Sequence, residues 1–111
     1  MFGKSKKLAP ILSGVGAVLR AEHRNRTTGK VHGHEWEVRA WFYYDGTDAE
    51  IRKYQLEKAL RPYQGTCLPD ALGWAEQMVA WLAVELNDGA DCRRVAISRH
   101  KEMLYAEWMQ P

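Results

Sequence analysis

Two long stretches of the chain alternate between apolar and polar positions, as a strand with one buried face does. The first covers residues 15–23, and the second begins in the run 30–36 and ends near Tyr44. Every second side chain of a strand points to the same side of its sheet, so each stretch has one mainly apolar face. We therefore expect two β-strands packed on a core. The apolar faces consist of Val15, Ala17, Leu19, Ala21 and His23 in the first strand, and His34, Trp36, Val38, Ala40 and Phe42 in the second.

The middle of the chain changes to a helical pattern. Thr47 and Glu50 have the spacing of a capping box, in which Thr47 accepts from the backbone N–H of Glu50. We expect a first helix over residues 48–61, with Pro62 at its end because proline cannot continue a helix. The stretch 64–68 (Gln-Gly-Thr-Cys-Leu) is interpreted as a connection.

A second helix and a hairpin complete the predicted elements. Pro69 and Asp70 suit the first turn of the helix, because proline lacks only a donor that is unused there. Asn-Asp-Gly at residues 87–89 ends this helix. Two further strands are expected at residues 94–99 and 103–108. The apolar stripe of the second helix consists of Leu72, Ala75, Val79, Leu82 and Leu86.

This order of elements, β-β-α-α-β-β, predicts a fold of the α+β class. Two helices on one face of a four-stranded antiparallel sheet are the simplest packing. At 111 residues the chain has room for a single domain over 1–111, and residues 1–10 are expected to form a flexible basic tail. Such a sheet leaves its edges open, and a small domain often manages open edges by joining other subunits.

Three histidines lie at the ends of the two predicted apolar faces. His32 and His34 are two residues apart and therefore point to the same side of a strand, while His23 closes the first strand on its apolar side. Gly33 leaves the position between them without a side chain that could crowd a metal. Three neutral imidazoles with a fourth position left open are typical of a zinc site. The sequence therefore predicts a Zn²⁺ site.

Composition and charge exclude several classes of protein. Apolar residues make up 46% of the chain, which is ordinary for a globular domain, and the net charge of +2 is too small for a nucleic-acid-binding surface. Two cysteines, Cys67 and Cys92, do not form a disulfide framework. The lysine-rich N-terminus could alternatively be a signal peptide. Cleavage near Ala21 would then remove the strand that leads into His23. No run is long enough to span a membrane, so we expect a cytoplasmic protein without nucleic-acid or membrane partners.

The ligand spacing and the order of elements resemble the 6-pyruvoyl-tetrahydropterin synthase and 6-carboxytetrahydropterin synthase family. The resemblance covers about residues 15–109. Its specific part is Ala-Glu-His at 21–23 together with His-Gly-His at 32–34, which are similar to the family's Ala-Ala-His and His-Gly-His zinc ligands. The stretch 76–82 (Glu-Gln-Met-Val-Ala-Trp-Leu) is also similar to the family's second helix.

The resemblance implies a fold, a cofactor and a reaction. The fold is the tunnelling fold, in which subunits join their sheets into trimeric barrels that stack as hexamers, with active sites between subunits. The implied ligands of Zn²⁺ are His23, His32 and His34. The family eliminates triphosphate from 7,8-dihydroneopterin triphosphate, so an active chain would be a zinc-dependent lyase. The implied partners are a small-molecule ligand, a pterin or a related heterocycle, and further copies of the chain in a trimer or hexamer.

Three positions depart from the family pattern. Thr28 stands where the family has its proton-abstracting cysteine, and a hydroxyl is a far weaker base than a thiolate. Gln64 and Gly65 stand in the region where the family has an Asp-His pair. Arg99 stands where a glutamate anchors the pterin ring, and a guanidinium has no acceptor for the donors of that ring.

These departures leave three hypotheses open. The chain is a zinc enzyme with a changed substrate, for which zinc-activated water is the active species. Alternatively it holds zinc without catalysis, or it is a pterin synthase whose missing residues are supplied elsewhere. The sequence leaves open whether the chain is an enzyme. Arg99 is the candidate for substrate binding, and the candidates for the missing catalytic group are Cys67, His100 and Glu102, with Glu22 and Glu35 as further proton carriers.

Overall fold

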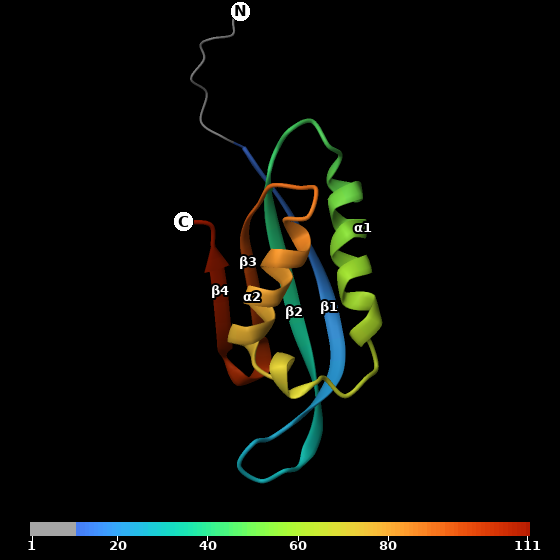
Figure 1. Cartoon of the computed structure of the whole chain (residues 1–111), viewed down its shortest axis with the longest axis vertical. Helices are drawn as coiled ribbons and strands as arrows, with labels where there is room; N and C mark the ends of the chain where they lie inside the picture. Colours follow the sequence, from blue (N-terminus) through green and yellow to red (C-terminus); the bar gives the residue numbers. More distant parts are fainter. Residues whose placement is uncertain (1–10) are drawn as a thin grey trace, which may run out of the picture.

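The structure is a computed structural model that describes residues 11–111, so the predicted basic tail at 1–10 lies outside the described residues. Its centre is one antiparallel sheet with the strand order β1-β2-β3-β4 (Figure 1). The strands are β1 (Leu12–Arg24), β2 (Val31–Tyr43), β3 (Cys92–Arg99) and β4 (Leu104–Met109). Each strand pairs with its neighbour in sequence, which confirms the predicted α+β class and order of elements.

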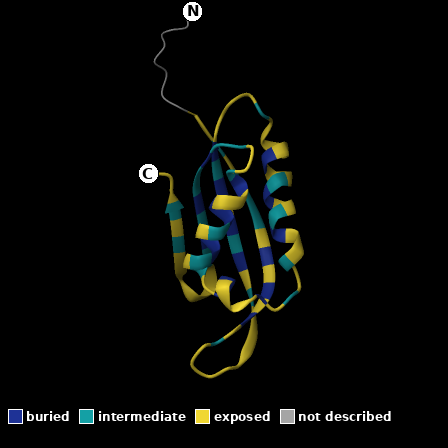
Figure 2. Cartoon of the chain, in the orientation of Figure 1, coloured by how far each residue is buried: buried dark blue, intermediate teal, exposed yellow. Residues whose placement is uncertain are grey.

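Both helices lie on the same face of this sheet. The helix α1 (Ala49–Leu60) packs against β1, and α2 (Ala75–Leu86) packs against β3 and β4. Burial alternates along the strands, with the predicted apolar faces turned toward the helices (Figure 2). Trp36, Val38 and Phe42 of β2 are each at most 1% exposed, so the centre of the core lies beneath the helices. Neither helix is long and apolar enough to cross a membrane.

The N-terminus of α1 differs from the predicted capping box. Asp48, not Thr47, is the N-cap residue, and its carboxylate accepts a hydrogen bond of 2.7 Å from the backbone N–H of Glu50. The backbone N–H of Thr47 instead donates to the Asp45 carboxylate at 3.0 Å. Aspartate and threonine are both good N-caps, so adjacent positions compete, and here the turn that begins at Asp45 decides between them.

The predicted start of the second helix is wrong by several residues. Residues 70–72 form only a short 3₁₀ turn, η3 (Asp70–Leu72), and α2 begins at Ala75. Between them Trp74 is extended, with φ −119° and ψ 145°, and its backbone N–H donates to the Gln77 side chain at 3.3 Å. This break frees the carbonyl of Gly73 from a helical hydrogen bond, and the carbonyl points instead at a histidine of β1.

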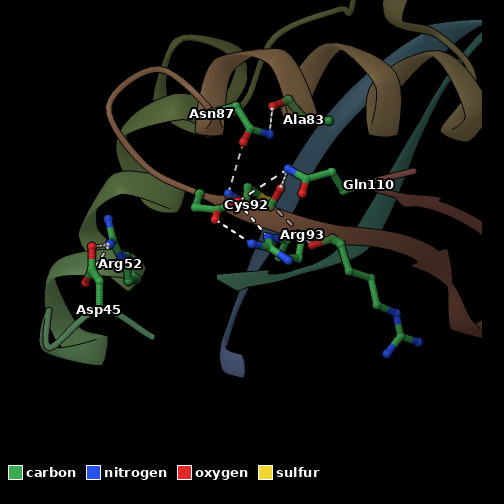
Figure 3. Close-up of polar contacts among 9 residues, drawn as sticks. Asp45, Arg52, Ala83, Asn87, Cys92, Arg93 and Gln110 are labelled. Atoms are coloured by element: carbon green, nitrogen blue, oxygen red, sulfur yellow. Dashed lines mark hydrogen bonds and ion pairs between the residues drawn. The ribbon is translucent and has the colours of Figure 1, made fainter. Parts of the chain in front are cut away.

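The C-terminus of α2 is tied to β3 by the side chain of Asn87 (Figure 3). Its Nδ2 donates to the carbonyl of Ala83 at 2.8 Å, and its Oδ1 accepts from the backbone N–H of Cys92 at 3.0 Å. The first bond adds a second donor to a carbonyl that also accepts from the backbone N–H of Asn87 at 3.1 Å, and the second bond fixes the start of β3. Asn87 is therefore the residue that holds the helix and the strand in register.

Replacing Asn87 by alanine is expected to lower the free energy of unfolding by about 1–3 kcal/mol, because two hydrogen bonds are lost and the partly buried N–H of Cys92 is left without a partner. Chemical denaturation measures the change. Asp88→Ala is the matched control, since Asp88 is exposed. Equal stabilities for the two variants would contradict the role assigned to Asn87.

The outer edge of β1 is covered along half of its length. The stretch 64–68, which the sequence suggested to be a simple connection, runs beside β1, where the N–H of Glu22 donates to the carbonyl of Thr66 at 2.8 Å and the N–H of Leu68 donates to the carbonyl of Glu22 at 2.7 Å. The side chain of Gln64 continues this pairing toward Val18. The edge that the sequence predicts to be open is therefore partly covered. Among the described residues, neither the stretch 64–68 nor its side chains reach residues 12–17 of this edge, where the carbonyl of Gly16 accepts from Nζ of Lys53 at 2.7 Å.

Candidate metal centre

The register of the β1–β2 hairpin brings three histidines together. His23 lies directly opposite His32, and His34 follows two residues later, opposite Ala21. Each pair of imidazole centroids is 4.8 Å apart. One nitrogen of each ring can be chosen so that all three lie within 4.8 Å of one another. These residues, called here the three-histidine cluster, are thus assembled as the strand faces predict.

A hydrogen bond to the backbone orients His23. Its Nδ1 lies 2.7 Å from the carbonyl oxygen of Gly73, which can only accept, so Nδ1 carries the proton and Nε2 has the free lone pair. This Nε2 faces the Nε2 of His32 at 3.1 Å. Two nitrogens on one tetrahedral zinc would be roughly 3.3 Å apart, given Zn–N distances of about 2.0–2.1 Å. The spacing of these two nitrogens therefore fits a shared metal.

His34 has a buried nitrogen that needs a partner. Its Nε2 has no hydrogen-bond partner among the described residues, and an unpaired buried polar atom is unfavourable. Its other nitrogen, Nδ1, faces the Glu102 carboxylate at 3.7 Å. Burial, together with the nearby Arg99, lowers the pKa of His34 to about 4, so the ring is neutral at pH 7. A neutral ring with an unpaired Nε2 is what metal coordination requires.

Arg99 and Glu102 lie beside the cluster at the end of β3. The short turn η4 (His100–Glu102) folds Glu102 back, so that its carboxylate is 3.1 Å from Nε of Arg99. Nη1 of Arg99 is 3.5 Å from Nε2 of His23. The Arg99 side chain is only 16% exposed. The structure thus places the predicted substrate-binding arginine directly against a candidate metal ligand.

A cavity of about 250 Å³ opens onto the cluster from the side of the helices. His23, His32 and Arg99 line this cavity together with Trp74 at the start of α2. Tyr105 borders it at the edge strand, but its ring points to the face of the sheet away from the helices, because Ala106 and Trp108 are the β4 residues that pack against the core. Sequence reasoning missed Gly73 and Trp74 as parts of this site. The signal was the glycine inside the predicted second helix, which interrupts the helix and turns its carbonyl toward His23.

The candidates for the missing catalytic group, His100, Glu102 and Cys67, lie outside this cavity. His100 and Glu102 line a second hollow on the far side of His34, together with Glu22 and Glu35. Cys67 is exposed and pairs through its backbone with Glu22, and it lines neither hollow. The structure therefore does not bring its thiol to the cluster.

Thr28 and Gln64, two of the residues that differ from the family pattern, form hydrogen bonds that stabilise the fold. The hydroxyl of Thr28 accepts from the N–H of Lys30 at 3.2 Å within the exposed hairpin loop. The Gln64 side chain bonds the backbone of β1 on both sides, to Val18 and Arg20. A side chain at Gly33 would make only ordinary contacts with Glu22 and Ala21, so this glycine is not what keeps the metal side clear.

Comparison with known proteins gives one kind of match. No protein-family model matches the chain, and no curated protein matches its sequence. Among solved structures it is similar to the structure of Caenorhabditis elegans 6-pyruvoyl tetrahydropterin synthase, with a TM-score of 0.74, 12% identity and full coverage of both chains. The chain therefore has the tunnelling fold that the resemblance in sequence predicted. At this identity the likeness concerns the fold.

Proposed function

We propose that the chain is a zinc-binding protein with a 6-pyruvoyl-tetrahydropterin-synthase-like fold, in which His23, His32 and His34 hold the metal and leave one position open to a small-molecule ligand. The observation that carries the proposal is the convergence of three imidazoles, with the otherwise unpaired Nε2 of His34 among them. The carbonyl of Gly73 supports it, because hydrogen bonds to the second nitrogen usually orient histidines that bind metal.

The residues around the cluster favour a ligand other than the family substrate. Bound zinc would supply Lewis-acid chemistry at this position. Arg99 presents only donors to the ligand, whereas the donor-rich edge of a pterin needs acceptors. Glu102 is the candidate to exchange a proton with a ligand, because its carboxylate faces Nδ1 of His34 at 3.7 Å. Like His100, it lines the second hollow and not the cavity of about 250 Å³.

Metal analysis of the protein purified without chelator tests this proposal. We expect close to one zinc per chain, because each of the three histidines offers a nitrogen within 4.8 Å of the other two and the nitrogens of His23 and His32 are already 3.1 Å apart. A zinc content near zero, after expression in medium that contains zinc, would contradict it. If the analysis finds a different divalent ion at one per chain, the proposed site is retained and only the identity of the metal changes.

We further propose that the chain assembles as a trimer or hexamer through its sheet edges. The part of β1 without backbone partners at the outer edge, residues 12–17, has the same length as the six-residue strand β4 on the opposite edge, and only the Lys53 side chain bonds to it, at Gly16. Apolar side chains are exposed at both edges, which is unfavourable for an isolated chain. These side chains are Ile11, Leu12 and Val18 at β1, and Leu104, Tyr105 and Met109 at β4.

Light scattering is expected to give a trimer or hexamer for the wild type and a smaller species for Tyr105→Pro. The N–H of Gln110 points to β3, so by alternation the N–H of Tyr105 points outward, where proline removes a donor needed only for pairing with another subunit. Tyr105→Ser controls for the lost ring. A monomeric wild type at micromolar concentration would contradict edge-to-edge assembly.

A further inference from the structure

A metal bound by the three-histidine cluster would lie close to the positive charge of Arg99, and the described residues neutralise this charge only in part. Its Nη1 is 3.5 Å from Nε2 of His23, so a metal held by that nitrogen would lie within about 5.5 Å of the guanidinium. A divalent cation and a guanidinium repel each other strongly at such a distance in a partly buried site. The position is therefore unfavourable for Arg99 unless negative charge lies between the two.

The nearby side chains compensate only part of this charge. The carboxylate of Glu102 is the one acidic group in contact with Arg99, at 3.1 Å, and it also faces His34. Arg24 and Glu76 line the same cavity, but both are exposed and carry opposite charges. The histidines are neutral as metal ligands. With metal bound, the site keeps an excess of positive charge that points into the cavity.

We infer that the ligand of this site is a small carboxylate, bound with one oxygen at the open metal position and the other on the Arg99 guanidinium. This inference rests on the proposed function. In this pose the negative charge of the carboxylate lies between the metal and Arg99, and the oxygen on Arg99 accepts a charge-assisted hydrogen bond. The cavity, at about 250 Å³, is smaller than the usual drug-sized pocket of about 300–1,000 Å³. Trp74, which lines the cavity, suits a compact ligand with a flat apolar body.

Glu102 has a defined part in this arrangement. Its carboxylate forms an ion pair with Nε of Arg99 at 3.1 Å, without a hydrogen bond at that buried nitrogen, while Nη1 of Arg99 lies toward His23. Arg99 is thus a specificity residue for the charge of the ligand, and Glu102 is a positioning residue that acts through it. A neutral ligand of the same shape gains the aromatic contacts but leaves the repulsion between metal and arginine unrelieved.

Cobalt(II) in place of zinc allows a test by visible absorption, which reports a change of ligand at the metal without any measurement of activity. Benzoate is the probe, benzamide is the neutral probe of the same shape, and inorganic phosphate is the alternative oxyanion. We expect benzoate to change the spectrum with saturation. Benzamide is expected to leave it unchanged at equal concentration, and phosphate to bind at least about tenfold more weakly than benzoate. Equal responses to benzoate and benzamide, or tighter binding of phosphate, would overturn the inference.

Variants of Arg99 and of a control arginine, Arg61, test whether Arg99 is the residue that binds benzoate. Arg99→Gln is expected to weaken benzoate binding at least about tenfold and, in buffer free of other anions, to bind cobalt more tightly because the repulsion is removed. Arg61→Gln is the control, because Arg61 is an exposed arginine that does not line the cavity, and it should change neither affinity more than about twofold. Arg99→Lys keeps the charge and should bind benzoate with intermediate affinity. Unchanged benzoate binding in a folded Arg99→Gln protein would overturn the inference. Failure of the wild type to bind one cobalt per chain would instead reject the proposed function itself.

Discussion

Replacing His32 by alanine is expected to abolish tight zinc binding and to remove the stabilisation that the metal gives. A metal at about 100 times its dissociation constant stabilises the folded state by about 2.7 kcal/mol. For a domain of this size, 1 kcal/mol shifts the melting temperature by about 4–8 °C, so zinc should raise it by about 10–20 °C. His32 is the exposed member of the cluster, so its loss removes a ligand without opening the core.

Thermal unfolding with and without EDTA, at one protein concentration, measures this effect. The wild type should lose about 10–20 °C on addition of the chelator, whereas His32→Ala should melt at the same low temperature in both conditions. His100→Ala is the matched control, because His100 is the one histidine of the chain outside the cluster and is exposed. If EDTA leaves the wild-type melting temperature unchanged, the metal does not contribute to the folded state.

The second large effect is expected in the reaction of the family that the sequence resembles. We expect conversion of 7,8-dihydroneopterin triphosphate to be at least about a hundred- to ten-thousand-fold slower than a typical enzyme rate, because a general base commonly contributes that much. Thr28 lies in an exposed loop with its hydroxyl bonded to the backbone, and Gln64 is occupied with the edge of β1. Neither residue is placed to move a proton at the three-histidine cluster.

Chromatography of pterin products measures this rate, with His32→Ala as the variant that lacks the proposed metal site. Turnover of at least about one per second that disappears in His32→Ala would contradict the expectation and would show that the base lies elsewhere. Cys67→Ser and Glu102→Gln would then separate the two remaining candidates. The thiol lies outside both hollows, so Glu102→Gln is expected to have the larger effect.

The sheet and the histidine cluster could be predicted because both depend on one short-range rule. Alternation along a strand decides which side chains share a face, and antiparallel pairing of neighbouring strands then places His23 opposite His32. The apolar faces could be assigned in the same way, since a shift of one residue would expose Trp36 and Phe42. No long-range information was needed for these features.

The features that the sequence did not predict depend on contacts between distant parts of the chain. Helix α2 begins late because Gly73 turns its carbonyl to His23, fifty positions earlier in the sequence. The stretch 64–68 covers β1 through backbone hydrogen bonds, which depend little on side-chain type and leave no periodic pattern. The approach of Glu102 to Arg99 depends on Met103, whose left-handed backbone (φ 55°) closes the turn and which is not a glycine.

The most direct test of the metal centre is X-ray absorption at the zinc edge, measured on the protein as purified. The account predicts three imidazole nitrogens at about 2.0–2.1 Å and one further light atom at the open position. His34→Ala should lose this signal, because its Nε2 is the nitrogen that has no other partner. A spectrum that shows sulfur at about 2.3 Å, or a zinc signal that survives in His34→Ala, would contradict the assignment of His23, His32 and His34 as the ligands.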